Sequence, residues 1–214
     1  LTKSGDTYSA STVTGFALTE ASTAKFAVAD DTADDAYSIK LTATGTGTLE
    51  FDFVDASDVV TLQTGSVVTG FTTLKVTDGT LDVTNADMSS ITRVEVASGV
   101  TLSATQAVAI PNLISTSATG SITIEVKTVA EATLVQTALS NGTMNVFGAT
   151  GNVTIAAASD AAADVTAEVI STAQTQAATS LQVASAAPEA PVTDAAADDA
   201  AADDAAADDA AADD

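Results

Sequence analysis

The chain has 214 residues, with 29 acidic and 6 basic side chains and a formal net charge of −23. It contains no Cys, His or Trp, which excludes disulfides and thiol chemistry. The shortage of Lys and Arg argues against nucleic acid as a partner. Much of the 46% hydrophobic content is Ala, which buries little area, so we expect a thin core in an extended or repetitive fold.

The lead segment, residues 1–36, is rich in Thr, Ser and Ala and predicts one strand, at residues 25–28. From residue 37 to 43, and again from 49 to 53, apolar residues alternate with polar ones. Gly45 and Gly47 lie between these two runs. Alternation on both sides of a glycine-containing loop predicts a β-hairpin, with Glu50 and Asp52 facing outward.

A looser repeat follows, in which Leu74, Val94 and Leu113 begin equivalent strands 20 and 19 positions apart. Each unit is expected to hold a strand, a turn, a second strand and a short helix. Periods near 20 residues are typical of stacked, solenoid-like folds. A β-sandwich with short helical crossovers explains the same pattern, so the two architectures remain open.

Two of the short helices carry capping-box signals, which start at Ser103 and Thr128. The first helix is expected to stop before Pro111 and the second at Gly142. Strands are expected to return at residues 144–146 and 153–155.

An amphipathic helix is predicted over about residues 160–186, because apolar residues recur there at intervals of four. Its narrow apolar face consists of Val165, Val169, Ala173, Ala177 and Leu181. Beyond Pro188 the chain repeats Asp and Ala with a period of five, which places Asp pairs on every side of a helix and predicts a disordered tail. Ten of the 29 acids follow Pro188, which leaves 19 acids and 6 bases, a net charge of −13, upstream.

The fold class expected from these elements is mainly β. The repeat-built domain is β-solenoid-like or a β-sandwich with short helices, followed by one C-terminal helix and a disordered acidic tail. The expected parts are the lead segment at 1–36, the β-repeat domain at 37–157, the amphipathic helix at 158–187 and the tail at 188–214.

Catalysis is not expected, because the usual general base and thiol nucleophile are missing and no phosphate-binding loop or triad motif is present. Calcium is the one cofactor that the sequence favours, since it prefers several carboxylate oxygens on loops. The candidate ligands form two clusters of acids: Asp30, Asp31, Asp34 and Asp35, and Asp52, Asp55 and Asp58. Solvated acidic loops are the alternative interpretation, and neither cluster matches an EF-hand or a calcium β-roll repeat.

Two other motifs are set aside. The sequons at Asn141 and Asn152 arise readily by chance in a Thr-rich chain. Thr-x-Thr pairs, such as Thr42 with Thr44, suggest an ice-binding array, but the repeats at Leu74 and Val94 do not carry the pair at an equivalent place.

Five stretches of the sequence remain to be placed: residues 59–71, 74–76, 79–83, 100–107 and 122–139. They resemble stretches of large bacterial RTX-associated and S-layer-like surface proteins, and the resemblance covers about residues 37–157. It implies secretion without an N-terminal signal peptide, a cell-surface location, and lattice, adhesive or biofilm roles that often depend on calcium. The Gly-Asp nonapeptides that bind calcium in such proteins are missing here, so no ligand residue is carried over.

We therefore expect a non-enzymatic, extracellular structural protein of a bacterial cell surface. Its partners would be copies of itself, joined at exposed sheet edges into an S-layer-like lattice or filament. An adhesin or biofilm-matrix module that binds cell-surface glycans is the alternative. The sequence has no initiator Met, no signal peptide and no transmembrane segment, which suggests a processed product or a fragment.

Overall fold

The computed structural model describes residues 2–4, 7–10, 15–19, 23–28, 36–53, 56–149 and 152–182. Side chains are described for residues 24–27, 36–53, 56–149 and 152–181. The expected disordered tail at 188–214 lies outside the described residues, as do the candidate calcium ligands Asp30, Asp31, Asp34, Asp35 and Asp55.

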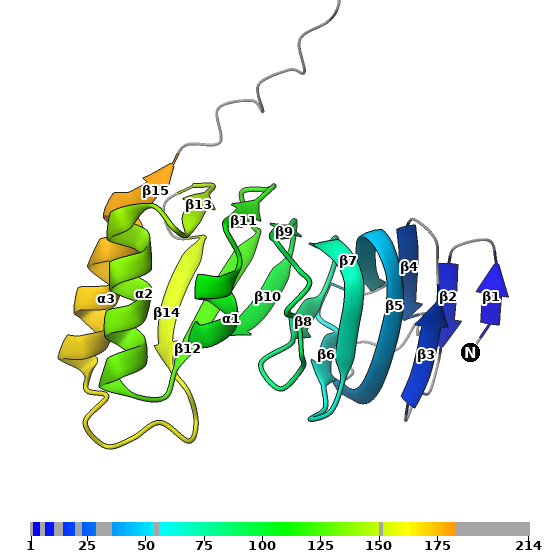
Figure 1. Ribbon diagram of the computed structural model, residues 1–214, viewed down its shortest axis with the longest axis horizontal. Coiled ribbons are helices and arrows are strands. Elements are labelled where there is room, and N and C mark those ends of the chain that lie inside the picture. The colour runs from blue at the N-terminus through cyan, green and yellow to red at the C-terminus, as the bar shows by residue number, and fades with distance from the viewer. Residues whose placement is uncertain are drawn as a thin grey trace, which may run out of the picture.

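The described chain is built mainly of short strands, with three helices in its C-terminal half (Figure 1). The strands are β1 (Thr2–Ser4), β2 (Thr7–Ala10), β3 (Gly15–Thr19), β4 (Thr23–Val28), β5 (Ala36–Phe53), β6 (Val59–Leu62), β7 (Val67–Val76), β8 (Thr80–Asp82), β9 (Arg93–Val96), β10 (Gly99–Ser103), β11 (Asn112–Ser115), β12 (Ser121–Val126), β13 (Asn145–Phe147), β14 (Val153–Ala157) and β15 (Leu181–Gln182). The helices are α1 (Ala104–Ala109), α2 (Val129–Asn141) and α3 (Ala167–Ser180).

Two parallel sheets form the body of the molecule. Sheet A runs β5-β7-β9-β11-β13-β15, and sheet B runs β5-β6-β8-β10-β12-β14. The long strand β5 belongs to both, because residues 36–39 pair with β6 and residues 42–51 pair with β7. Strands β3 and β4 extend sheet A on the other side of β5.

Each coil of the chain passes from a sheet B strand, across a third side, to a sheet A strand, and then turns a corner into the next coil. The segments of the third side are residues 63–66, 83–92, 104–111, 127–144 and 158–180. The three helices lie in the last three of these segments and stand next to one another at one end of the molecule (Figure 1). The architecture is therefore a β-solenoid, which confirms the mainly β prediction and decides against a sandwich.

The predicted hairpin around Gly45 and Gly47 is wrong. Residues 36–53 form one continuous strand, and each half pairs in parallel with the next coil. The glycines serve a β-bulge instead of a reversal, because the register with β7 shifts between Thr44 and Gly47. Gly70 of β7, with φ of +82°, lies directly against the carbonyl oxygen of Gly45, so the irregularities of the two strands stack.

The repeat of about 20 residues is confirmed as the coil of the solenoid. Leu74 lies opposite Val94 in sheet A, and Val94 lies opposite Leu113. Because parallel strands in register put equivalent side chains on the same face, each coil buries its apolar residues directly above those of its neighbour.

The helix caps follow the predicted signals. Ser103 and Gln106 form the capping box of α1, which ends before Pro111 as expected. At α2 the Thr128 hydroxyl accepts from the Glu131 backbone, while the Glu131 carboxylate accepts from the Lys127 backbone N–H and not from Thr128. Helix α2 ends at Gly142, whose φ is +73°, as the sequence predicts.

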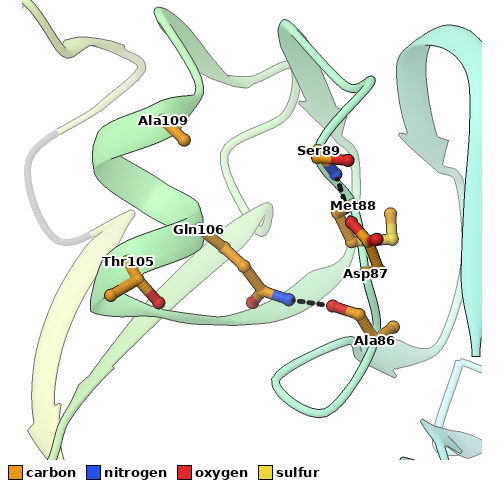
Figure 2. A pocket seen from close by; sticks show the side chains of 7 residues that line it. All are labelled: Ala86, Asp87, Met88, Ser89, Thr105, Gln106 and Ala109. Atoms are coloured by element: carbon orange, nitrogen blue, oxygen red, sulfur yellow. Dashed lines mark hydrogen bonds between the residues drawn. The ribbon is translucent and has the colours of Figure 1, made fainter. Parts of the chain in front are cut away.

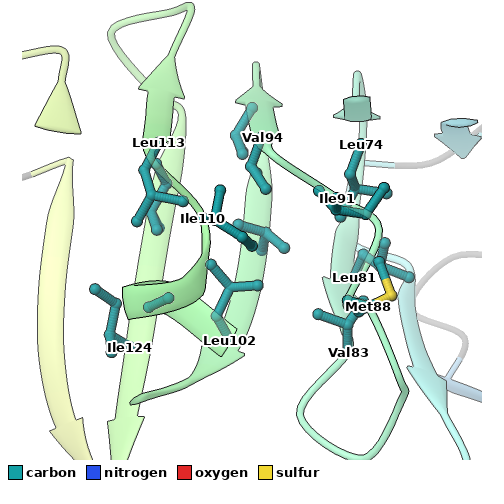
Figure 3. Packing of buried hydrophobic residues seen from close by; sticks show 14 of the residues in the cluster. Leu74, Leu81, Val83, Met88, Ile91, Val94, Leu102, Ile110, Leu113 and Ile124 are labelled. Carbon is teal, nitrogen blue, oxygen red and sulfur yellow. The ribbon is translucent and has the colours of Figure 1, made fainter. Parts of the chain in front are cut away.

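The core fills the space enclosed by the three sides. Figure 3 shows residues from sheet A and sheet B facing one another, with residues of the third side between them. The labelled members are Leu74, Val94 and Leu113 from sheet A, Leu81, Leu102 and Ile124 from sheet B, and Val83, Met88, Ile91 and Ile110 from the third side. All are buried, so the thin core expected from composition runs as one column through the stack.

The C-terminal helix is shorter than predicted. It begins at Ala167 after the N-cap Thr166 and ends at Ser180, because Leu181 enters β15 and pairs with Val146. The predicted apolar face is confirmed for the three members within the helix: Ala173 and Ala177 are fully buried and Val169 is partly buried against the core. Val165 lies before the helix and Leu181 after it, and both are also partly buried. The helix and β15 are therefore parts of the last coil and not an appendage.

The lead segment holds more structure than the sequence predicted. The expected strand at residues 25–28 is confirmed within β4, which pairs with β5 from Thr23 to Val28. Strands β1, β2 and β3 were not predicted. They lie in Thr- and Ser-rich stretches whose alternation is too weak to distinguish a strand from a loop.

A buried asparagine forms hydrogen bonds that link the corner segments of the last coils. The Nδ2 group of Asn152 donates to Ser115 Oγ at 2.6 Å, to the Ser117 carbonyl at 3.0 Å, and to the Gly120 carbonyl. The Asn152 carbonyl accepts from the Ile122 N–H at 2.7 Å. With 4% of its surface exposed, Asn152 is a structural residue, which agrees with setting its sequon aside.

Candidate functional surfaces

The outer face of sheet A carries a row of alternating charge, here called the charged row. It consists of Lys25 on β4, Glu50 on β5, Lys75 on β7 and Glu95 on β9. Each is flanked in its strand by buried residues, so each points outward. The pairing of the four strands in register places the four side chains side by side, about 4.8 Å apart from strand to strand.

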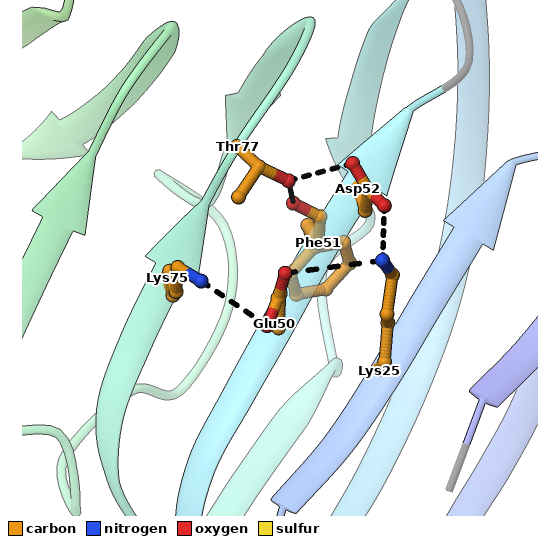
Figure 4. Close-up of polar contacts among 6 residues, drawn as sticks. All are labelled: Lys25, Glu50, Phe51, Asp52, Lys75 and Thr77. Atoms are coloured by element: carbon orange, nitrogen blue, oxygen red, sulfur yellow. Dashed lines mark hydrogen bonds and ion pairs between the residues drawn. The ribbon is translucent and has the colours of Figure 1, made fainter. Parts of the chain in front are cut away.

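Ion pairs link neighbouring members of this surface. Lys75 Nζ lies 3.4 Å from a Glu50 carboxylate oxygen, and Lys25 Nζ lies 4.0 Å from the other. Figure 4 shows that Lys25 also contacts Asp52, whose carboxylate accepts a 2.7 Å hydrogen bond from the Thr77 hydroxyl. Such exposed pairs contribute about 0–1 kcal/mol each, so they order the surface more than they stabilise the fold.

The protonation states follow from these contacts. The hydrogen bond to Asp52 is the main reason that the pKa of Lys25 is raised; burial acts against it, and the negative charges of Asp52 and Glu50 add to the rise. Burial acts to raise the pKa of Asp52, but hydrogen bonds from Lys25 and Thr77 outweigh it and hold that pKa below its ordinary value. Both groups are therefore charged at neutral pH.

The outer face of sheet B carries a second row, here called the hydroxyl row. Its members are paired in register, strand to strand, and point outward: Ser38, Thr61, Asp82, Thr101, Thr123 and Thr154. All but one are neutral hydroxyls. Asp82 differs, and its carboxylate accepts from the Thr84 N–H at 2.9 Å and from the Thr84 hydroxyl at 2.7 Å.

A hollow of about 310 Å³ lies beside the hydroxyl row. It is lined by Thr80, Ser98, Gly99, Val100, Thr101, Thr119, Ser121 and Thr123. Two positions before the row, Gly99 lies between Thr80 and Ser121 on the neighbouring strands, and any side chain there would collide with the Thr80 hydroxyl. The lining is thus neutral and rich in groups that both donate and accept hydrogen bonds.

A smaller groove of about 190 Å³ lies between α1 and the third-side segment before it (Figure 2). Its polar groups are engaged with one another. Gln106 Nε2 donates to the carbonyls of Val83 at 2.7 Å and Ala86 at 2.8 Å, and Asp87 accepts from the Ser89 N–H at 3.0 Å. Hydrogen bonds from Ser89 hold the pKa of Asp87 below its ordinary value.

Two of the seven predicted calcium ligands lie within the described residues, and they are in different surroundings. Asp52 is on the outer face of sheet A, paired with Lys25. Asp58 is buried in the corner before β6, where its backbone carbonyl accepts from the Thr80 N–H at 2.8 Å. Within the described ranges, no three His, Cys, Asp or Glu side chains lie close enough together to hold a metal ion. The calcium site remains a prediction, because the other five acids lie outside those ranges.

One carboxylate has a raised pKa. Burial raises the pKa of Glu125 on β12, and the negative charges of Asp82 and Asp160 add to this effect, while Lys127 opposes it. Lys127 is itself paired with Asp160 at 2.7 Å.

Neither row was predicted from the sequence. The repeats at Leu74 and Val94 are sheet A positions, so their alignment does not show the regular hydroxyls of sheet B. When the sheet B strands are aligned at Val60, Leu81 and Val100, the residue that follows each of these positions is a member of the hydroxyl row. The charged row has its own sequence pattern, in which one charged residue stands between two apolar residues in each of its sheet A strands.

The chain matches no family model, no curated protein and no solved structure. In the part of the chain that the structure describes, no helix is long and apolar enough to span a bilayer.

Proposed function

We propose that this chain is a non-enzymatic structural protein of a bacterial cell surface, which acts outside the cell and assembles with copies of itself into a lattice or filament. The observation that supports this most is the solenoid itself, whose stacked coils present two long parallel sheets with outer faces. Such faces suit side-by-side packing of identical units. The absence of His and Cys from the sequence agrees with a non-enzymatic role.

Copies are expected to pack side by side through their outer faces and not by strand addition at the C-terminal edge of sheet B. That edge is occupied, because Gln174 of α3 hydrogen-bonds both Val153 and Ile155 of the last strand, β14. Addition of a further strand at this edge, one of the contacts that the sequence analysis expected, would have to displace Gln174. The outer faces carry no such obstacle.

Calcium is proposed as the ion that permits close approach of the copies. At a net charge of −23 the chains repel one another, and divalent cations screen or bridge carboxylates. Titration calorimetry with calcium, together with melting in calcium and in chelator, tests this. A binding heat and a raised melting temperature are expected, and their absence together refutes a calcium role.

Assembly is tested by light scattering and electron microscopy of the full chain, with and without calcium. We expect ordered particles or sheets larger than the monomer in at least one condition. A protein that stays monomeric in both conditions, over the whole soluble concentration range, contradicts the proposed function.

A second candidate function is glycan binding, as in an adhesin or biofilm-matrix protein. The hollow on sheet B favours it, because its neutral hydroxyl lining suits an uncharged saccharide. Its lining contains no aromatic ring on which a sugar could stack. Glycan-array binding by the wild type that is lost in Thr101→Val and kept in Thr133→Val, an exposed helical threonine, would support this function. Equal binding by both variants would place the glycan elsewhere.

A further inference from the structure

The charged row has a property that its separate ion pairs do not reveal. Read across the sheet, its four members carry positive, negative, positive and negative charge, on four adjacent strands. An alternating row with an even number of members becomes its own complement when it is reversed. A two-fold axis that lies between two facing sheets and runs parallel to their strands reverses the order of strands, so the row can pair with a second copy of itself.

We propose that two copies of this chain dock face to face through sheet A, about a two-fold axis that lies between the two faces, runs parallel to the strands and passes between Glu50 and Lys75. In this arrangement Lys25 of one copy faces Glu95 of the other, and Glu50 faces Lys75. Each contact occurs twice, as an isologous interface requires. Face-to-face sheets pack about 10 Å apart, a gap that Lys and Glu side chains can bridge from both sides.

The neighbouring positions on the same strands fit the arrangement. An axis parallel to the strands keeps their direction, so the residue two positions before each member of the row faces the residue two positions before its counterpart, and the same holds for the residues two positions after. The pairs brought together in this way are Thr48 with Thr73, Asp52 with Thr77, Ala27 with Ala97, and Arg93 with Thr23. None of these contacts opposes two like charges, and the Asp52 carboxylate gains a facing hydroxyl.

Charge balance distinguishes this patch from the chain as a whole. It holds three of the six basic residues, Lys25, Lys75 and Arg93, against the three acids Glu50, Asp52 and Glu95, so its net charge is zero in a chain of −23. A neutral, self-complementary patch allows two acidic molecules to approach without local repulsion. Pairs within each copy already restrain these side chains, which lowers the entropy lost on docking.

The inference rests on the proposed self-assembly and names its interface. The test uses two charge reversals of the full chain, Lys75→Glu and Glu50→Lys, with dimerisation measured by sedimentation equilibrium. Each variant alone opposes like charges twice in the homodimer, so its dimer dissociation constant should rise by roughly 100-fold. In an equimolar mixture of the two variants all four contacts are again of opposite sign, and a heterodimer of wild-type affinity should form.

Lys127→Glu serves as the matched control, because it changes net charge by the same amount as Lys75→Glu but lies outside sheet A, paired with Asp160. It should dimerise like the wild type. Lys75→Gln, which removes the charge without reversing it, should give an intermediate constant if a reversal impairs folding. Assembly that is equally strong in Lys75→Glu refutes this interface and leaves the proposed function intact. No heterodimer from the mixture also refutes the interface, and no self-association by any variant or the wild type refutes both.

Discussion

Gln174 of α3 and Ile155 of β14 are joined by a hydrogen bond from the Ile155 backbone N–H to Gln174 Oε1, at 2.6 Å. The same side chain donates from Nε2 to the Val153 carbonyl at 2.7 Å. One amide thus imitates the N–H and C=O groups that another strand would offer to this edge. The helix that carries it closes the C-terminal end of sheet B, as terminal caps do in repeat proteins.

Replacing Gln174 with Met, which keeps the volume and removes the amide, should expose the β14 edge. We expect hydrogen exchange at the Ile155 amide to speed up and stability to fall by about 1–3 kcal/mol, because a buried donor and acceptor lose their partner. Exchange followed by mass spectrometry or NMR provides the measurement. Gln176→Met on the same helix, where the amide bonds only Ser180, should leave Ile155 unchanged. Unaltered exchange in Gln174→Met would contradict the capping role.

Asn152→Ala should destabilise the last coils by about 2–3 kcal/mol. It removes the donor to Ser115, Ser117 and Gly120 in a corner that water does not reach. Chemical denaturation measures the loss. Asn141→Ala, at the exposed end of α2, removes a local contact with Thr143 and should cost less than about 1 kcal/mol. Equal costs for the two variants would argue against the corner as a stabilising element.

A comparison of Gly70→Ala with Gly142→Ala separates the stability cost of a strained backbone conformation from the cost of a steric clash. Both glycines have positive φ, +82° and +73°, so both substitutions should cost about 1 kcal/mol from conformation alone. At Gly70 the new methyl group would also collide with the Gly45 carbonyl, whereas at Gly142 nothing lies within 4 Å. We expect a further loss of about 1–3 kcal/mol at Gly70, seen as a lower melting temperature. Similar melting temperatures would mean that the stacked bulges can move apart.

Glu125→Gln should stabilise the protein at neutral pH. The folded pKa of Glu125 is raised above its ordinary value of 4.5, so the ionised form is less favourable in the folded state than in the unfolded state. This penalty is fully present above the folded pKa and vanishes as pH falls below the ordinary value. The variant should therefore be more stable than the wild type at pH 7 and show no gain near pH 3. A gain of the same size at both values would assign the effect to packing.

The elements that local chemistry specifies could be predicted from the sequence. The Ser103 and Thr128 helix starts, the stop at Gly142 and the strands around Leu74, Val94 and Leu113 all follow from patterns within a few residues. The apolar face of α3 was likewise predictable from its spacing.

The interpretation of Gly45 and Gly47 failed for a physical reason. A glycine accommodates a bulge and a reversal equally well, and the choice depends on which strand lies alongside. In this fold the neighbours are β4 and β7, which lie in coils before and after β5. The bounds of α3 failed similarly, because Leu181 leaves the helix to pair with Val146.

The sequence by itself determined the β-rich class, the coil period, the helix caps and the lack of His and Cys chemistry, because each is a property of composition or of residues near one another in the chain. The tertiary structure decided the solenoid over the sandwich, and it alone brought together Lys25, Glu50, Lys75 and Glu95, which are 20 to 25 positions apart. Parallel register between coils sets which side chains share a row, and that register depends on the length of every intervening turn.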